Sequence, residues 1–372
     1  MDLLHNLALG FATAATPLSL VLCLAGVFLG TAVGVLPGIG PLAAIAMLLP
    51  ITFHLPPAAA LVMLAGVYYG NEYGGSIASI LLNIPGSPSS SITCLDGYPL
   101  ARAGKAGVAL FMTAAASFCG ALVGITVMAL ASPALARFAL LFGPAEYFAI
   151  MLLGLVSAAI VSGSGPVRGA MMVLSGVLLG TVGLDMTSGE TRFTAGILEL
   201  RDGINLGVVA MGLFGVSEVM AALRETPSTG PAGRFKLADM LPDREEARRS
   251  AAPAVRGSLI GALLGTLPGT GQVVSSFMAY ALERKISPNR AQFGKGAIEG
   301  VVVPEAANNA AAQSSFIPTL TLGIPGSPTM ALMLGAMMIH GIVPGPRIIE
   351  EHPDLFWGWW SASSSATSSC WC

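Results

Sequence analysis

Two short segments rich in proline and glycine interrupt long apolar stretches of the chain, at residues 36–41 (LPGIGP) and 267–271 (LPGTG). Proline lacks a backbone N–H and clashes with the preceding turn, so a regular helix ends at such a segment. The helix that ends offers carbonyl groups and a partial negative charge, whereas the helix that begins offers N–H groups and a partial positive charge. The segments therefore predict a site for a cation beside an anion. A kink that serves only packing is the alternative.

A second kind of break occurs at residues 84–88 (IPGSP) and recurs at residues 324–328, each time near neutral polar side chains. Inside a membrane, a break leaves N–H and carbonyl groups that protein, water or a ligand must satisfy. We expect the backbone donors and the neutral hydroxyl and amide groups of both kinds of break to bind an organic anion. The candidate substrate-binding residues are Pro37, Gly38, Gly40, Asn83, Pro85, Gly86, Ser87, Pro268, Gly269, Gly271, Asn308, Asn309, Pro325, Gly326 and Ser327.

Two carboxylates lie within apolar sequence close to these breaks, Glu72 in the first half of the chain and Glu305 in the second. Ionisable residues inside a membrane are expensive and indicate a function by default. Carboxylate, amide and carbonyl oxygens are the ligands that hard cations prefer. We expect both residues to bind a cation, sodium or a proton, whose movement is coupled to that of the organic anion. The alternative is that both lie at the membrane–water boundary, where their charge costs little.

The residue types that enzymes use are present but are not arranged for catalysis. The four histidines are not spaced with cysteine or carboxylate residues as a metal site or a catalytic triad requires. No phosphate-binding loop with its lysine occurs, and the net charge of −2 gives no sign of a nucleic-acid partner. We therefore expect no enzyme, no cofactor, no metal site and no nucleic acid. An intramembrane enzyme that uses a polar break as its active site is the rival interpretation.

The composition indicates that a membrane protein positions these residues. Hydrophobic residues make up 54% of the chain, charged residues only 10%, and the mean hydropathy is +0.75. Soluble domains carry about a quarter charged residues. Apolar runs of about 20 residues, roughly 30 Å long as helix, match the bilayer core; they cover residues 17–36, 108–130, 138–160 and 204–223. We expect an all-α polytopic membrane protein in the lipid bilayer.

The segment that contains the first break has a close copy in the second half of the chain. Residues 26–40 and 257–271 share seven of fifteen positions, and the IPGSP segments follow in the same order, which indicates a duplicated unit. Glycine at every fourth residue of each copy favours close helix packing. The expected organisation is a first transmembrane repeat with its following helices at 1–223, a cytoplasmic linker at 224–256, an incomplete second repeat at 257–358 and a serine-rich tail at 359–372.

The charges that flank the two copies bear on their orientation. Seven of the eighteen basic residues lie in 224–256, and more follow residue 282, so the positive-inside rule places both flanks of the second copy in the cytoplasm. We expect residues 257–282 to form a re-entrant helical hairpin, with one long helix kinked at Pro268 as the alternative. The first copy has no basic flank, which suits entry from the opposite face and hence an inverted repeat, as in transporters.

These motifs resemble those of the large membrane subunit of the tripartite tricarboxylate transporters, the TctA-type family. The resemblance rests on GVLPGIGP at 34–41, YGGS at 73–76, LLNIPG at 81–86, DGYP at 96–99, EAANNA at 305–310, PTLTLGIPG at 318–326 and HGIVPGP at 340–346. It implies a multi-pass permease of the bacterial inner membrane that works with a small membrane subunit and a periplasmic solute-binding protein. It also implies uptake of di- and tricarboxylates such as citrate, together with sodium or protons.

The sequence departs from the family pattern after Gly358. Residues 359–372 are rich in serine and unlike the further membrane helices with which the family continues. We expect a frameshift or a truncation at this point, which would leave the second repeat without its closing helices. A non-transporting scaffold subunit is therefore a further alternative to a permease.

Overall fold

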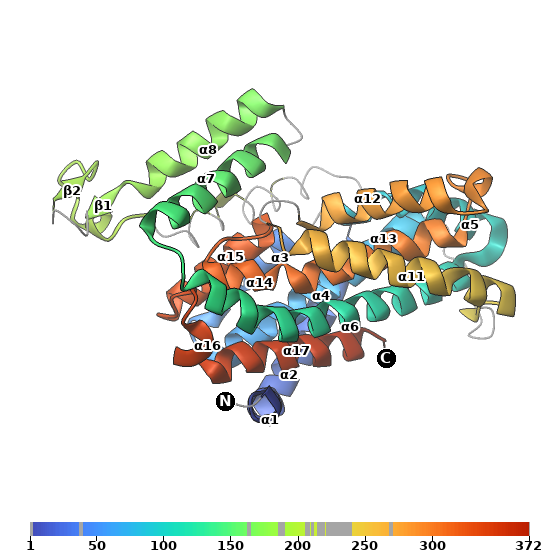
Figure 1. Cartoon of the computed structure of the whole chain (residues 1–372), viewed down its shortest axis with the longest axis horizontal. Coiled ribbons are helices and arrows are strands. Elements are labelled where there is room, and N and C mark those ends of the chain that lie inside the picture. The colour runs from blue at the N-terminus through green and yellow to red at the C-terminus, as the bar shows by residue number, and fades with distance from the viewer. Residues whose placement is uncertain are drawn as a thin grey trace.

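The computed structural model describes residues 3–36, 40–161, 165–184, 190–204, 240–267 and 271–371, with the isolated positions 209, 212–213 and 220. Helices dominate it (Figure 1). In the first part of the chain they are α1 (Leu3–Ala14), α2 (Pro17–Val35), α3 (Pro41–Thr52), α4 (Pro57–Leu82), η1 (Ser89–Ser91), α5 (Cys94–Leu100), η2 (Ala101–Lys105), α6 (Ala106–Ala139), α7 (Pro144–Val161), α8 (Pro166–Gly180) and η3 (Leu198–Asp202). In the second part they are α11 (Arg244–Gly265), α12 (Gly271–Ile286), η6 (Arg290–Gln292), α13 (Ile298–Ser314), α14 (Phe316–Leu322), α15 (Pro328–Ile339), α16 (Ile348–Glu351) and α17 (Pro353–Trp371).

The expected all-α class is confirmed for the described residues. Their only strands are two residues long: β1 (Gly183–Leu184) pairs antiparallel with β2 (Thr191–Arg192). Two described helical stretches, Pro17–Val35 and Cys94–Ala139, are long and apolar enough to cross a membrane. The expected run at 138–160 largely coincides with α7, and the run at 204–223 lies almost entirely outside the described residues.

Glycines bring α2 and α4 into direct backbone contact. A Cβ added to Gly30 of α2 would lie 2.1 Å from the carbonyl oxygen of Val67, and one added to Gly70 of α4 would lie 2.2 Å from that of Val27. Real Cβ atoms do not approach an oxygen so closely, so any larger residue would push the helices apart. The glycines therefore serve helix packing here, as small residues do between membrane helices.

The pair α11 and α13 repeats this contact in the second half of the chain. A Cβ added to Gly261 would lie 2.1 Å from the carbonyl oxygen of Ala307. The glycines of α2 approach the carbonyl groups of Met63, Val67 and Asn71 on α4. The glycines of α11 approach those of Val303, Ala307 and Ala311 on α13, each of which lies 240 positions further along the chain. The IPGSP segments have the same spacing. This shared contact register supports a duplicated unit, while the inversion of one copy stays a prediction.

The two ends of the segment 257–282 lie beside each other. Arg256 of α11 donates hydrogen bonds to Glu283 of α12 at 2.8 and 2.5 Å. A single continuous helix would separate these two residues by roughly 40 Å. The segment is therefore a helical hairpin rather than one long kinked helix, and its re-entry into the membrane stays a prediction.

The described end of the expected linker is helical. Asp243 caps α11 by accepting a hydrogen bond from the backbone N–H of Glu246, whose side chain accepts one from the N–H of Asp243 in return. Residues 244–256, expected in the linker, therefore form the first turns of α11, and residues 224–239 lie outside the described residues. At 22 residues, or about 33 Å, α11 is longer than the half-membrane arm expected for the hairpin.

The serine-rich tail is part of the helical core. It lies in α17, which packs against α1 and α4 (Figure 1). Trp359 and Ser363 are buried, and the hydroxyl group of Ser363 lies 3.0 Å from that of Tyr69 on α4. Residues 359–367 are thus all buried or half-buried. A change of reading frame at this point stays a prediction.

Candidate substrate and ion site

Three helices begin at one cavity of about 310 Å³. They are α3, α12 and α15, and residues of their first turns line the cavity, among them Pro41, Gln272 and Pro328. The first N–H groups of a helix have no partner within it and carry the positive end of the helix dipole. Both halves of the chain therefore contribute surplus hydrogen-bond donors to the same cavity.

Ser327 and Gly271 bring the two breaks of the second half together. Ser327 is the N-cap of α15, where its Oγ accepts a hydrogen bond from the N–H of Met330 at 3.3 Å, and Pro328 follows in the first turn. A Cβ added to Gly271, the first residue of α12, would lie 3.4 Å from the Cβ of Ser327. The starts of α12 and α15 thus lie side by side, with Ser327 in the cavity wall.

In the first half of the chain, Gly40 and Ser87 line the cavity. Gly40 is the N-cap of α3, and Pro41 is its first residue. The Oγ of Ser87 lies 2.9 Å from that of Ser89, and the N–H of Ser87 donates to the Oγ of Ser90 at 3.1 Å. These serines form a hydrogen-bonded turn that leads into η1 and places hydroxyl groups at the cavity wall.

Glu72 lines the same cavity from α4. The residue is 2% exposed, and its Oε2 accepts hydrogen bonds from Ser89 Oγ at 3.0 Å and from Asn308 Nδ2 at 2.9 Å. Within the described part of the chain, no lysine, arginine or histidine forms an ion pair with it. A carboxylate in such surroundings requires a proton or a bound cation to compensate its charge.

Glu305 lies near Glu72 but does not line the cavity. Its Oε1 accepts a hydrogen bond from Thr93 at 2.5 Å, and its Oε2 accepts one from Ser76 at 2.8 Å. The Oγ of Ser76 also lies 3.2 Å from the backbone carbonyl oxygen of Glu72. The contact register of the repeat aligns Glu72 with Ala312. The two carboxylates are therefore neighbours in the fold without occupying equivalent positions in the two halves.

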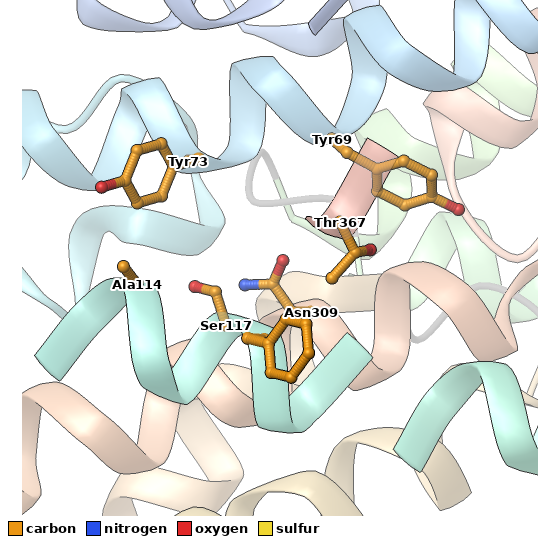
Figure 2. A pocket seen from close by; sticks show the side chains of 7 residues that line it. Tyr69, Tyr73, Ala114, Ser117, Asn309 and Thr367 are labelled. Carbon is orange, nitrogen blue, oxygen red and sulfur yellow. The ribbon is translucent and has the colours of Figure 1, made fainter. Parts of the chain in front are cut away.

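Asn308 and Asn309 have different surroundings although they are adjacent in α13. Asn308 donates to Glu72, whereas Asn309 donates to the carbonyl oxygen of Glu305 in its own helix at 3.0 Å. Asn309 lines a separate cavity of about 20 Å³, shown in Figure 2 with Tyr69, Tyr73, Ala114, Ser117 and Thr367. A space of this size holds about one water molecule. Of the two amides, only Asn308 is linked to the larger cavity.

The other predicted substrate residues in the described part of the chain do not line the larger cavity. Asn83 is an exposed C-cap of α4 in the left-handed conformation (φ 57°), and Pro85 is also exposed. Gly86 is packed so tightly that an added Cβ would lie 2.4 Å from the Cα of Gly75. Pro325 and Gly326 do not line the cavity, whereas residues 327–329, which follow them, do. The predicted residues outside the described part are Pro37, Gly38, Pro268 and Gly269.

The sequence matches one family model along most of its length. The model is that of the tripartite tricarboxylate transporter TctA family, and it matches residues 20–368. The chain belongs to this family. As a member of the TctA family it is a component of a membrane transporter and not an enzyme, which removes the intramembrane enzyme as an alternative. The match also includes most of the serine-rich tail that was expected to lie outside the family pattern.

Two relatives of this TctA-family chain come from Agrobacterium vitis. One is named as an uncharacterized 52.8 kDa protein in the TAR-I ttuC' 3'region; it is 50% identical over 358 residues, which cover 96% of this chain and 71% of that protein. The other is named as an uncharacterized protein in the TAR-II ttuC' 3'region. It is 61% identical over 98 residues, which cover 26% of this chain and 40% of that protein. No solved structure matches the chain.

Sequence reasoning missed three polar residues at the cavity of this TctA-family chain, Ser89, Gln272 and Thr329. Gln272 is 6% exposed, and its Nε2 donates a hydrogen bond to the hydroxyl group of Tyr68 in the other half of the chain. All three residues directly follow a predicted break. The available signal was therefore a polar side chain in the first turn of the helix that begins after each break.

Asp96 is a fully buried carboxylate in α5. Its Oδ1 accepts hydrogen bonds from the N–H groups of Gly294, Gly296 and Ala297 at 2.8 to 2.9 Å. Its Oδ2 accepts one from the hydroxyl group of Tyr280 at 2.8 Å. Hydrogen bonds to a carboxylate are stronger than neutral ones. Asp96 therefore fastens the first half of the TctA-family chain to the loop that precedes α13.

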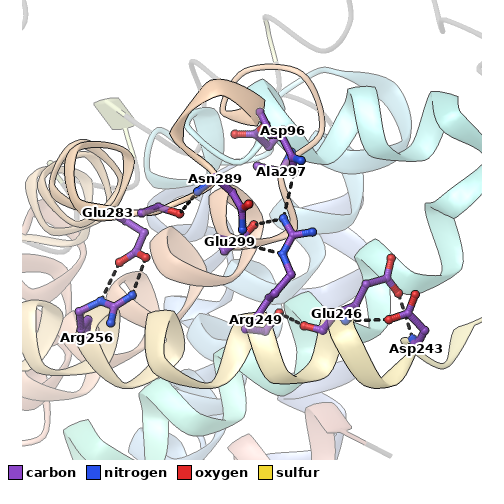
Figure 3. A network of polar contacts seen from close by, with 12 residues as sticks. Asp96, Asp243, Glu246, Arg249, Arg256, Glu283, Asn289, Ala297 and Glu299 are labelled. Atoms are coloured by element: carbon purple, nitrogen blue, oxygen red, sulfur yellow. Dashed lines mark hydrogen bonds and ion pairs between the residues drawn. The ribbon is translucent and has the colours of Figure 1, made fainter.

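Ion pairs join the start of α11 to its neighbours, away from the cavity (Figure 3). Arg249 donates to the carboxylate of Glu299 on α13 at 2.9 and 3.0 Å, and Lys105 donates to Glu246 at 2.5 Å. Burial tends to raise the pKa of Glu299, but the hydrogen bonds from Arg249 and Asn289 outweigh it and lower the pKa overall. Arg249 and Lys105 are thus both paired with carboxylates. None of the described residues lining the cavity of about 310 Å³ is basic.

Proposed function

We propose that this chain is the permease subunit that takes up di- and tricarboxylates such as citrate across the bacterial inner membrane. The observation that supports the proposal best is the cavity of about 310 Å³ at which α3, α12 and α15 begin. Ligand-binding cavities have volumes of roughly 300–1,000 Å³ and combine apolar walls with a few polar groups. The cavity has this size, and its wall combines apolar residues with serine, threonine and glutamine side chains.

The lining of the cavity suits a carboxylate anion. The first N–H groups of a helix bind anions through hydrogen bonds and through the helix dipole. Three helix starts offer such donors around one space, and Ser87, Ser327 and Gln272 add neutral polar side chains. A substrate with two or three carboxylates engages several donors at once. Its charge is then compensated without a lysine or an arginine.

Glu72 provides a means of coupling substrate to a cation. Two negative charges 4 Å apart repel each other by about 4 kcal/mol at an effective dielectric constant of 20. An ionised Glu72 and a substrate carboxylate therefore disfavour each other in the cavity that Glu72 lines. A proton or a sodium ion at Glu72 removes this repulsion. We infer that the ion binds together with the substrate, which makes transport a symport.

Glu305 is the second candidate for the coupling ion. Both of its carboxylate oxygens accept hydrogen bonds from hydroxyl groups, and Ser76 lies between it and the backbone of Glu72. It does not line the substrate cavity. We therefore assign direct coupling to Glu72 and a second, more distant ion position to Glu305.

Partners and membrane arrangement follow from membership of a tripartite family. We infer a small membrane subunit and a periplasmic solute-binding protein as partners, and several passes through the inner membrane. The shared contact register of α2–α4 and α11–α13 supports two copies of one unit. The basic flanks of residues 257–282, and the absence of such flanks around the first copy, support opposite orientations of the two copies.

Uptake into proteoliposomes tests the proposed function. The chain is reconstituted with the small membrane subunit and a cognate solute-binding protein, and labelled citrate is followed under a sodium gradient and a proton gradient in turn. Ser327→Ala removes a hydroxyl group from the anion site, so we expect the KM for uptake to rise about tenfold. Ser175→Ala on the exposed side of α8 is the matched control and should leave KM unchanged.

The possible outcomes separate the alternatives. If the intact complex accumulates no citrate or related carboxylate under either gradient, the chain is a scaffold subunit and the permease proposal is wrong. If uptake occurs and Ser327→Ala behaves as the control does, the chain is a permease whose substrate site lies elsewhere. Gradient-driven uptake with an altered KM in Ser327→Ala alone supports the proposal in full.

A further inference from the structure

A second cavity, of about 480 Å³, lies between α1, α6, α16 and α17 and shares no lining residue with the substrate cavity. Its wall contains one cationic side chain, Arg137 of α6, and one anionic side chain, Glu350 of α16. Both residues are exposed, and neither side chain forms an ion pair with another described residue. Two opposite charges that line one cavity without pairing suit a ligand that carries both a negative and a positive group.

Two buried polar atoms in the same wall also have no hydrogen-bond partner among the described residues. They are the Nε1 of Trp357, a residue with 0% exposure, and the Oδ1 of Asn6. Both atoms are inaccessible to water, so a ligand in the cavity cannot reach either of them. The polar groups that the cavity offers are therefore Arg137 as a donor and Glu350 as an acceptor.

The cavity lies at one end of a helix that is long enough to cross the whole bilayer. Arg137 is in the last turn of α6, and Lys105 directly precedes the first turn at the opposite end. The helix has 34 residues and is about 51 Å long, whereas a bilayer with its headgroups measures about 40–45 Å. Lys105 pairs with Glu246 in the basic region of the chain. Arg137 therefore lies in the headgroup region of the other leaflet.

The cavity wall continues onto an apolar surface of the same helix. Leu130, which lies two turns before Arg137 in α6, lines the cavity and is 63% exposed. In a membrane, exposed leucine side chains on a spanning helix face lipid tails. A charged cavity that opens onto such a surface fits a molecule with a polar headgroup and attached acyl chains.

We propose that this cavity binds a zwitterionic phospholipid whose headgroup carries a phosphate and a primary ammonium group, as phosphatidylethanolamine does. The phosphate accepts hydrogen bonds from Arg137. The ammonium group donates to Glu350, and the acyl chains follow Leu130 of α6. Phosphatidylglycerol has no ammonium group for Glu350. Phosphatidylcholine has a quaternary ammonium group that donates no N–H hydrogen bond.

Native mass spectrometry of the purified full chain tests this assignment. The chain is released from detergent micelles that contain equal amounts of phosphatidylethanolamine, phosphatidylglycerol and phosphatidylcholine. We expect phosphatidylethanolamine to be retained about tenfold more than either other lipid, since one charge-assisted interaction suffices for such a ratio. Glu350→Gln should remove this preference, whereas Arg137→Gln should lower the retention of all three lipids and Arg137→Lys should restore part of it.

Matched controls separate the cavity from charge in general. Arg168→Gln on α8 and Glu351→Gln, one position beyond Glu350 and outside the cavity wall, should retain the lipid as the unmodified chain does. Circular dichroism shows whether each variant keeps its helices. Equal retention of the three lipids by the unmodified chain, an unchanged preference in Glu350→Gln, or unchanged retention in Arg137→Gln overturns the proposal. A stabilising thermal shift with soluble glycerophosphoethanolamine that equals the shift with the lipid also overturns it, because the ligand would then be a free zwitterion.

Discussion

At the scale of single residues, Glu72 and Glu305 differ because their surroundings differ. Glu72 lines the substrate cavity, and a single oxygen, Oε2, accepts both of its hydrogen bonds. Glu305 lies outside the cavity wall, and each of its two oxygens accepts a hydrogen bond from a hydroxyl group. Glu72 is therefore the carboxylate at the cavity that we propose for the substrate. Both carboxylate oxygens of Glu305 already have hydrogen-bond donors within the protein.

Glu72→Gln tests the coupling role. The amide has nearly the same shape but carries no charge to be compensated, so substrate binding should persist without the ion. We expect gradient-driven accumulation of citrate to fall at least about tenfold, while exchange of citrate between the two sides stays within a few fold. Both rates are measured in the same proteoliposomes. Accumulation that still follows the gradient in Glu72→Gln would place the coupling ion elsewhere.

Asn308 and Asn309 offer a matched pair of variants at adjacent positions. Asn308→Ala removes a hydrogen-bond donor from Glu72, and a hydrogen bond to a charged group is worth about 1.5–3 kcal/mol. We therefore expect the ion concentration at half-maximal uptake to change about tenfold or more. Asn309→Ala removes a bond to a carbonyl group of its own helix and should leave this concentration within about twofold. Equal effects of the two variants would contradict the assignment of Asn308 to the ion site.

At the scale of helices, glycine decides which pairs come close and polar caps decide where helices begin. The pairs α2–α4 and α11–α13 bring backbone against backbone at glycines four residues apart. This close packing holds the helices whose ends border the cavity, because α2 leads into α3 and α11 leads into α12. The donors of the substrate site are thus positioned by contacts that contain no functional side chain.

Gly30→Ala and Gly261→Ala test the packing of these helices. The added methyl group would lie 2.1 Å from a backbone carbonyl oxygen in each case, and such overpacking costs about 1–3 kcal/mol. We expect both variants to unfold at clearly lower temperature in detergent. Gly176→Ala is the control, because an added Cβ there meets nothing within 4 Å. It should be neutral or more stable by up to about 1 kcal/mol, and a similar loss in all three variants would contradict the packing argument.

At the scale of the whole molecule, charged and neutral polar groups are separated. The described ion pairs join α11 to α12, to α13 and to the residues just before α6, whereas the lining of the substrate cavity contains no basic residue. Asp96 adds a further link between the halves through three backbone N–H groups. The basic residues of these ion pairs therefore lie outside the wall of the cavity that we propose as the anion site.

The pairing of Arg249 with Glu299 predicts how stability depends on pH. The pKa of Glu299 is lower in the folded chain than its ordinary value of 4.5. Its contribution to stability is therefore complete above about pH 4.5 and is lost as the pH falls through the folded pKa. Arg249→Gln should lower the unfolding temperature at pH 7, and the difference from the unmodified chain should shrink on acidification below pH 4.5. A difference that grows toward acid pH would contradict this role.

Much of the fold could be predicted because it depends on local chemistry. Apolar runs, helix ends at proline and glycine, and glycine spacing of four residues are properties of consecutive residues, and the helices α2, α3, α11 and α12 begin or end as these signals indicate. The expected end of the linker at residue 256 lies inside α11. The capping pair Asp243 and Glu246 was present in the sequence, but the charge of this region favoured a loop.

The composition of the substrate site depended on the tertiary structure. Successive residues of a helix point about 100° apart, so the sequence could not decide between Asn308 and Asn309, nor show that Gly40, Ser87 and Ser327 share a cavity while Asn83 and Pro85 are exposed. It also could not show that Glu72 and Glu305 are neighbours rather than equivalents. The sequence by itself determined the helical membrane class, the breaks and the small residues that permit close packing. Only the contacts between distant helices decided which donors and which carboxylate face one common space.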